Sequence, residues 1–285
     1  MDRKLTIYTL GIITGILSMI AAFIGLFNQN RVNLPDVINS RGDTIALYNL
    51  GIYAHDSIMI GAANRGTDLV VLTIGIPLLI IALWIYRKRE AHGLFLLSGI
   101  FAYFLYLYAT FSLSIAYNRL FLVYIIIFGI SFFGFILTLL KLSHILFQKS
   151  LKIQKTWIPY YLIIMGLVAG ILWAVDPITS LFLNTFPKMS IYPTLFTHAF
   201  DLAIIVPISI LSGILMRKKN PLGTLLAIPV LMIITMLFPS ICASTYFQHQ
   251  AGLIFTPQEI IGYIVSFLTL GIFGFISLRQ LYRTL

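Results

Sequence analysis

The sequence predicts an all-α integral membrane protein with eight transmembrane helices. Hydrophobic residues make up 59% of the 285 residues, charged residues make up 10%, and the mean hydropathy is +0.97. Soluble domains average about 25% charged residues. We therefore interpret residues 1–285 as a single membrane domain whose first expected partner is the lipid bilayer.

A helix that crosses a bilayer needs about 20 mostly apolar residues. Eight such runs are predicted, at residues 5–27, 69–86, 93–116, 120–140, 157–175, 194–216, 222–243 and 260–281. The first run follows Arg3 and Lys4, as in a signal peptide, but its length and the lack of a small-x-small cleavage site predict a retained helix. Residues 28–67 are predicted to form an extracytoplasmic loop.

The basic residues predict the orientation, because they collect on the cytoplasmic side of membrane proteins. With the N-terminus inside, fourteen of the nineteen Lys and Arg residues fall on the inner side, but only two of the nine acidic residues do. We therefore predict an N-in/C-in protein of the cell membrane with both termini cytoplasmic. Since each basic cluster lies at a helix end, the net charge of +10 does not indicate nucleic-acid binding.

A pattern in the first half of the chain recurs in the second half at a constant offset of 130 residues. It consists of Pro77, Arg87-Lys88 and Gly93, which recur as Pro207, Arg217-Lys218 and Gly223. Residues 133–136 and 273–276 also share the sequence Phe-Gly-Phe-Ile. The pattern predicts a four-plus-four parallel internal repeat with halves 1–148 and 149–285. The alternative is that Pro, Gly and basic residues punctuate helix ends by convention.

The sequence gives little support to enzyme chemistry. The single cysteine, Cys242, excludes an intrachain disulfide and a dithiol redox pair. No metalloprotease or nucleophile-elbow signature is present. Enzyme activity is therefore disfavoured, and no cofactor is assigned.

Asp201 is the strongest candidate for a functional residue. It lies 16 residues, or about 24 Å, before Arg217, which places it inside the hydrocarbon. Ionisable residues at this depth are functional candidates because burying them is costly. His198 and Asp201 share one helix face with Thr194 and Ser212.

Two neighbouring spans supply further candidate binding residues. Tyr103 and Tyr106 lie on one face of the third span, which ends near Arg119; packing is the alternative role for these tyrosines. Asp68 lies close to the outer boundary of the second span, next to Arg65. Gly66 is expected to end a short helix there, and Thr67 or Asp68 to cap the next one.

Three roles fit the pair formed by His198 and Asp201. The carboxylate could bind a proton or cation in ion-coupled transport. The pair could supply two metal ligands, with the outer-loop residues His55, Asp56 or His249 completing a zinc shell. Asp201 could also be structural and bond Arg65, Arg119 or a tyrosine hydroxyl.

The outer loops contain three local signals. Residues 37–48, around Arg41-Gly42-Asp43, predict a small hairpin. His55-Asp56-Ser57 is predicted to cap a short helix, and Thr256-Pro257-Gln258-Glu259 is a capping box that starts the eighth span. Together these loops could form a lid over an outward cavity; the alternative is that they are ordinary connections.

Long stretches of the second, third and fourth spans resemble a group of uncharacterised bacterial multi-pass membrane proteins. They are RGTDLVVLTIGIPLLIIALW, GLFLLSGIFAYFLYLYATF and NRLFLVYIIIF. The resemblance spans residues 65–219, implies a bacterial inner membrane and supplies no activity.

The leading hypothesis is that the protein binds or transports a small molecule or ion through an outward-facing polar pocket near the sixth, second and third spans. An outer-leaflet metal-dependent enzyme is one alternative. A non-catalytic accessory or scaffold subunit with a membrane-protein partner is the other.

Overall fold

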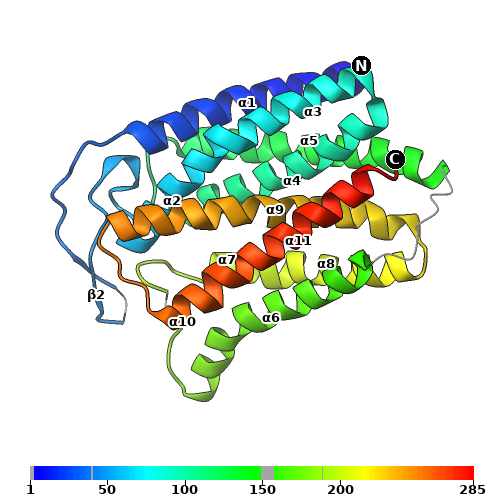
Figure 1. The fold of residues 1–285 in the computed structure, drawn as a ribbon. Coiled ribbons are helices and arrows are strands. Elements are labelled where there is room, and N and C mark those ends of the chain that lie inside the picture. The colour runs from blue at the N-terminus through cyan, green and yellow to red at the C-terminus, as the bar shows by residue number, and fades with distance from the viewer. Residues whose placement is uncertain (1–2, 40, 149–156, 188) are drawn as a thin grey trace.

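The computed structural model describes residues 3–39, 41–148, 157–187 and 189–285, which form a bundle of long helices (Figure 1). Eight helical spans among these residues are long and apolar enough to cross a membrane, which confirms the predicted class and number of spans. Several residues in the charge comparison lie outside the described residues: Asp2, Lys149, Lys152, Lys155 and Lys188.

Five of the spans are single helices, and three are interrupted. The single helices are α1 (Arg3–Phe27), α4 (Glu90–Leu113), α5 (Phe121–Gln148), α6 (Ile158–Phe182) and α9 (Pro221–Gln250). The second span comprises α2 (Ile58–Val70), η2 (Val71–Gly75) and α3 (Ile76–Lys88). The sixth comprises α7 (Phe196–Phe200), η3 (Asp201–Ile205) and α8 (Val206–Arg217), and the eighth α10 (Pro257–Glu259), η4 (Ile260–Val265) and α11 (Ser266–Tyr282).

The interruptions η2, η3 and η4 are π-helical turns. Pro77 and Pro207 explain the first two, because a proline lacks an N–H and its ring clashes with the carbonyl four residues earlier. Each wide turn closes one residue before the proline, where the N–H of Ile76 or Val206 donates to the carbonyl five residues back. Such turns are frequent at functional sites, and η3 begins with Asp201.

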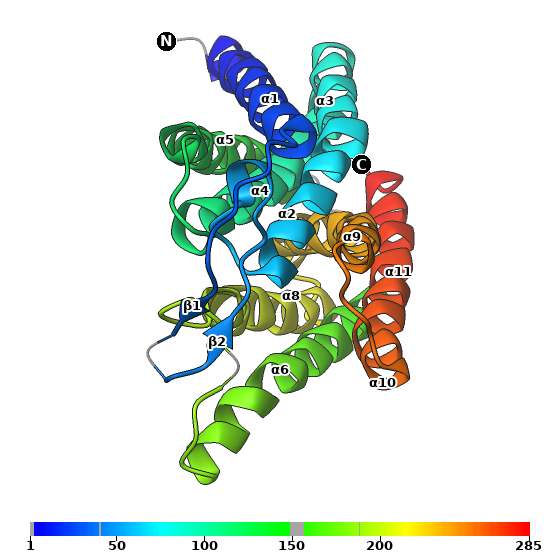
Figure 2. The same ribbon diagram turned by 90° about the vertical axis from the view of Figure 1, so that its left-hand side faces the viewer.

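The helices α4 and α9 form the centre of the bundle. In α4, 83% of the most apolar 18-residue window is buried, and in α9 the buried share is 61%. In every other span it is 39% or less. Figure 2 shows α1, α3, α4 and α5 above α9, α2 beside it, and α6 and α8 below it. Both ends of the chain lie at the same end of the bundle (Figure 1).

The second span begins earlier than predicted, at Ile58 rather than near residue 69. The expectation that Gly66 ends a helix and that Thr67 or Asp68 caps the next was wrong, since all three lie inside α2. The glycine serves helix packing instead. A Cβ at Gly66 would overlap the backbone of α9 at Ala243 and Ser244, so glycine permits the close approach of α2 and α9.

The loops at the end of the bundle opposite the two termini (Figure 1) are called the outer loops here, after the predicted orientation, and their three local signals are confirmed. The hairpin consists of β1 (Val37–Ile38) and β2 (Thr44–Ile45), with Arg41 to Asp43 in its turn. It contacts the loop between α6 and α7, where Arg41 donates to the carbonyl of Pro187 at 2.7 Å. Ser57 is the N-cap of α2, and the capping box of Thr256 and Glu259 is present.

Candidate functional site

Asp201 is buried in the first half of the sixth span, and 5% of its surface is exposed. The span begins at Phe196, three residues after Pro193, so the carboxylate is interior to the helix and cannot cap it. The Tyr106 hydroxyl of α4 donates to Asp201 Oδ2 at 3.3 Å, and Oδ1 is buried without a hydrogen-bond partner among the described residues. Asp201 thus pairs with a tyrosine hydroxyl, one of the structural alternatives from the sequence.

No cation neutralises Asp201 within the described part of the chain. The ion pairs there are Arg41 with Asp43 and Lys141 with Glu90, both at the ends of the bundle. A buried carboxylate without a partner cation is costly to ionise.

His198 lies one turn before Asp201 and contacts the fifth span. The centres of the His198 and Trp173 rings are 4.5 Å apart in an edge-on arrangement. Asp176 favours the charged form of His198 electrostatically. The Trp173 side chain also interacts with the Asp201 carboxylate. The sequence reasoning missed Trp173 and Asp176. Their spacing of three residues, in an otherwise apolar span, was the available signal.

Asp68 lies in a second buried cluster, on the other side of α4. Only 1% of its surface is exposed, and the Tyr53 hydroxyl donates to its Oδ2 at 2.7 Å. Tyr53 belongs to the short helix η1 (Gly51–Tyr53) of the outer loop and is fully buried. The loop therefore reaches into the bundle and closes it above this carboxylate.

The two predicted tyrosines of α4 belong to different clusters. Tyr106 bonds Asp201, whereas Tyr103 is buried close enough to Asp68 to interact with it electrostatically. Tyr108 and Tyr124 are also buried and interact with Asp68 in the same way. The helix α4 thus separates two buried carboxylates, each bonded by one tyrosine hydroxyl.

Arg65 lies one turn toward the outer end from Asp68, on the same helix. Its side chain donates to the Leu26 carbonyl at 2.8 Å and to the Tyr48 hydroxyl at 3.3 Å. The guanidinium lies 5.1 Å from the centre of the Phe247 ring. Arg65 is 9% exposed and Nε is buried without a partner, so this cation lacks a direct carboxylate partner in the described chain.

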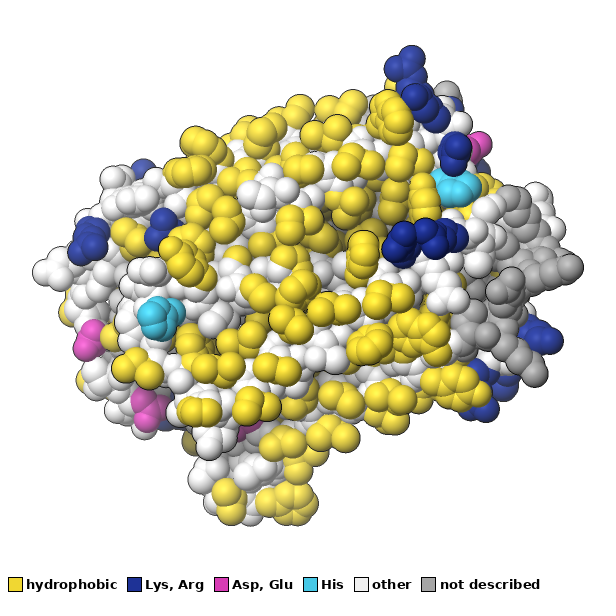
Figure 3. Space-filling model, in the orientation of Figure 1, with side chains coloured by type: hydrophobic (Ala, Val, Ile, Leu, Met, Phe, Trp, Pro, Cys, Tyr) yellow, Lys and Arg dark blue, Asp and Glu magenta, His cyan; other side chains and the backbone are white. Residues whose placement is uncertain are grey.

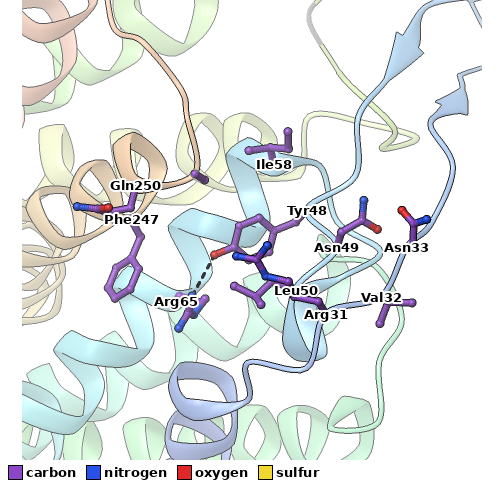
Figure 4. A pocket seen from close by; sticks show the side chains of 11 residues that line it. Arg31, Val32, Asn33, Tyr48, Asn49, Leu50, Ile58, Arg65, Phe247 and Gln250 are labelled. Carbon is purple, nitrogen blue, oxygen red and sulfur yellow. Dashed lines mark hydrogen bonds between the residues drawn. The ribbon is translucent and has the colours of Figure 1, made fainter.

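A pocket of about 570 Å³ opens above Arg65 (Figure 4). It is formed by the loop after α1, the segment before η1, the start of α2 and the end of α9. Arg31, Asn49 and Gln250 line it together with Arg65, Tyr48 and Phe247, and no Asp or Glu is among the described residues that line it. The pocket is therefore positively charged with a partly aromatic wall.

The remaining candidates do not join either cluster. Arg119 is exposed and lies outside the pocket. His55 and His249 are exposed. Within residues 3–39, 41–148, 157–187 and 189–285, no group of three or more His, Cys, Asp or Glu residues is arranged to hold a metal ion.

Asp56, considered from the sequence as a metal ligand, joins three outer segments. Its Oδ1 accepts from the Ala116 N–H and from the Tyr192 hydroxyl, each at 2.8 Å, while Oδ2 is buried and has no hydrogen-bond partner in the described part of the chain. Burial raises the pKa of Asp56 to about 6, although the two hydrogen bonds favour the charged form. We name this residue and its two donors the Asp56 clamp.

No protein-family model, curated protein or solved structure matches the chain.

Proposed function

We propose that this polytopic membrane protein binds a small anion, carrying a carboxylate or a phosphate, in the pocket above Arg65. Arg65 carries the proposal: its guanidinium is nearly buried, contacts neutral groups and has no ion-pair partner among the described residues. Asp68 attracts the guanidinium but is too far from it to form an ion pair, so the buried charge remains costly. An anionic ligand would offset that cost.

The chemistry of the pocket favours an anion over a cation or a neutral molecule. Arg31 and Arg65 supply two guanidinium groups, which bind carboxylates and phosphates through paired hydrogen bonds. Asn49 and Gln250 can donate further hydrogen bonds through their amides. Figure 4 shows Tyr48 and Phe247 on either side of Arg65, so an apolar part of the ligand would contact aromatic rings.

We also propose the N-in/C-in orientation, which makes the pocket accessible from the outer side. Lys and Arg side chains gather at the end that holds both termini, and hydrophobic side chains cover the middle of the face shown in Figure 3. Single cysteines at Arg41 and Lys88, in a Cys242→Ser background, test this orientation. A membrane-impermeant maleimide should label Arg41→Cys in intact cells and Lys88→Cys only after the membrane is opened.

The four-plus-four repeat remains a proposal, and three equivalences at the offset of 130 support it. The π-helical turns η2 and η3 occupy equivalent positions. The central helices α4 and α9 follow α3 and α8, which begin at the equivalent residues Ile76 and Val206. A Cβ at Gly93 would overlap the backbone of Tyr86, and one at Gly223 would overlap the backbone of the equivalent residue, Met216.

Anion binding can be tested on the purified protein in lipid nanodiscs. Isothermal titration calorimetry with benzoate, oxalate, sulfate and inorganic phosphate should detect binding of at least one anion, whereas choline should not bind. Arg65→Gln should weaken binding by about tenfold or more, because a charged hydrogen bond is worth roughly 1.5–3 kcal/mol. Arg119→Gln is the matched control, since it removes an exposed outer arginine outside the pocket. Equal loss of binding in both variants would contradict the proposal.

A further inference from the structure

Arg65 and Asp68 connect the pocket to the buried acid beneath it. They are three residues apart on α2 and therefore lie on one face of that helix. Arg65 reaches the pocket, whereas Asp68 is enclosed below it. The two attract each other electrostatically, but their charged atoms are too far apart to form an ion pair.

The groups that interact with Asp68 come from η1, α1, α4, α5 and its own helix. Tyr53 of η1 donates to the carboxylate, and Tyr103 and Tyr108 of α4 and Tyr124 of α5 are the other titratable groups that interact with it. On α1 the neighbour is Gly25, whose missing side chain leaves the space that the carboxylate occupies. Among these groups Arg65 is the cation, so it balances the negative charge of Asp68.

Charge balance predicts what happens when an anion enters. The ionised pair of Arg65 and Asp68 has no net charge, and a bound monoanion adds one negative charge beside a buried carboxylate. A net charge in a poorly solvated site is unfavourable. One proton on Asp68 restores neutrality, and it needs no additional space in a carboxylate that already packs against Gly25 and Tyr53.

We propose that Asp68 takes up one proton from water when an anion binds to Arg65, so that the protein binds the anion and the proton together. This inference rests on the proposed anion site. It implies that anion binding at Arg65 is coupled to proton binding at Asp68. Because coupling between two ligands is reciprocal, a lower pH strengthens anion binding to the same extent that the anion strengthens proton binding.

Calorimetry in two buffers of different ionisation enthalpy counts the protons taken up for each anion bound. The probe is benzoate, a monoanion that stays fully ionised between about pH 6 and 8.5, where carboxylates of ordinary pKa have lost their protons. The wild type should take up about one proton for each anion. Its affinity should fall by up to tenfold for each unit of rising pH once free Asp68 is ionised.

Asp68→Asn should bind the anion without proton uptake and with an affinity that does not depend on pH. Asp36→Asn is the matched control, since it removes an exposed acid of the outer loop and should behave as the wild type. The wild-type proton count does not depend on any variant, so the inference stays testable if Asp68→Asn fails to fold.

The outcomes separate the inference from the function on which it rests. Anion binding without proton uptake at every pH would overturn the coupling but leave the anion site intact. Proton uptake that persists in folded Asp68→Asn would overturn the role of Asp68. Failure of all the anions to bind would overturn the proposed function, and the coupling with it.

Discussion

The Asp68 carboxylate occupies the space in which a side chain on Gly25 would lie. A Cβ at Gly25 would overlap Asp68 Oδ2 and would come 2.8 Å from the Tyr53 hydroxyl. The absence of a side chain on α1 thus lets an acid on α2 meet a tyrosine from the outer loop. This contact holds three segments of the chain together at the base of the pocket.

Gly25→Ala should therefore separate Asp68 from Tyr53 and destabilise the protein by about 2–4 kcal/mol, through overpacking and the loss of a charged hydrogen bond. Thermal unfolding in detergent measures the change. Gly129→Ala is the control, since nothing lies within 4 Å of its added Cβ and alanine favours a helix. An equal effect of the two substitutions would show that the Asp68 contact is unimportant.

The Asp56 clamp should make the stability of the outer loops depend on pH. The folded pKa of Asp56 is about 6 against an ordinary value of 3.8, so the folded state binds the proton more tightly than the unfolded state does. The stabilising contribution is therefore complete below about pH 4 and is lost as the pH rises to about 6, by roughly 3 kcal/mol.

Hydrogen exchange of residues 47–57, followed from pH 4 to 8, would report this change after correction for the intrinsic exchange rate. Asp56→Asn keeps an acceptor for Ala116 and Tyr192 but cannot ionise, so its protection should vary less with pH. Asp36→Asn should retain the wild-type profile because Asp36 is exposed. A wild-type profile in Asp56→Asn would assign the titration to another group.

The Tyr106 hydroxyl should stabilise the folded protein more when residue 201 is a carboxylate than when it is an amide. Tyr106→Phe removes the hydrogen bond to Asp201 and should cost about 1–3 kcal/mol, because a buried acceptor then loses its donor. In Asp201→Asn the same tyrosine substitution should cost less, since a neutral amide is cheaper to leave unpaired.

Unfolding of the two single variants and the double variant forms a double-mutant cycle that measures this coupling. Tyr117→Phe, at a side chain that is 76% exposed, should be neutral in both backgrounds. Strict additivity would mean that the hydroxyl contributes nothing to holding Asp201.

Composition and apolar run length predicted the eight spans because a helix that crosses a bilayer must be mostly apolar over about 20 residues. Run length failed at the outer start of the second span, where polar residues such as Asn64 and Arg65 lie within α2. They are accommodated because α1, α9 and the outer loop enclose them, and the apolar pattern of one helix does not report such neighbours. Gly66 was expected to end a helix because the sequence of α2 does not show that α9 packs against this glycine.

The candidate site could be predicted only in part. The cost of burying charge singled out Asp201, and helical spacing related His198 to it. Asp68 was expected to cap a helix at the outer boundary, with Arg65 as a candidate binding residue beside it. The partners Trp173 and Tyr53 come from segments that are distant in sequence and meet these residues only through tertiary packing. The pocket could not be predicted, since Arg31, Tyr48 and Phe247 carry no shared pattern.

The close contact of α2 with α9 at Gly66 should control the shape of the pocket as well as stability. Around this contact, the Ser244 hydroxyl donates to the Ala63 carbonyl at 2.8 Å and Gln248 Nε2 donates to the Met59 carbonyl at 2.9 Å. Gly66→Ala would push the α9 backbone away, strain both bonds and carry Phe247 away from Arg65.

We expect Gly66→Ala to destabilise the protein by about 1–3 kcal/mol, as overpacking does in close-packed interiors. In the fraction that folds, anion affinity should fall about fivefold or more, because Phe247 and Arg65 both line the pocket. Calorimetry on monodisperse protein separates the two effects. Gly262→Ala, with nothing within 4 Å of the added Cβ, should change neither quantity. Unchanged affinity in folded Gly66→Ala would mean that the pocket does not depend on how closely α2 and α9 approach.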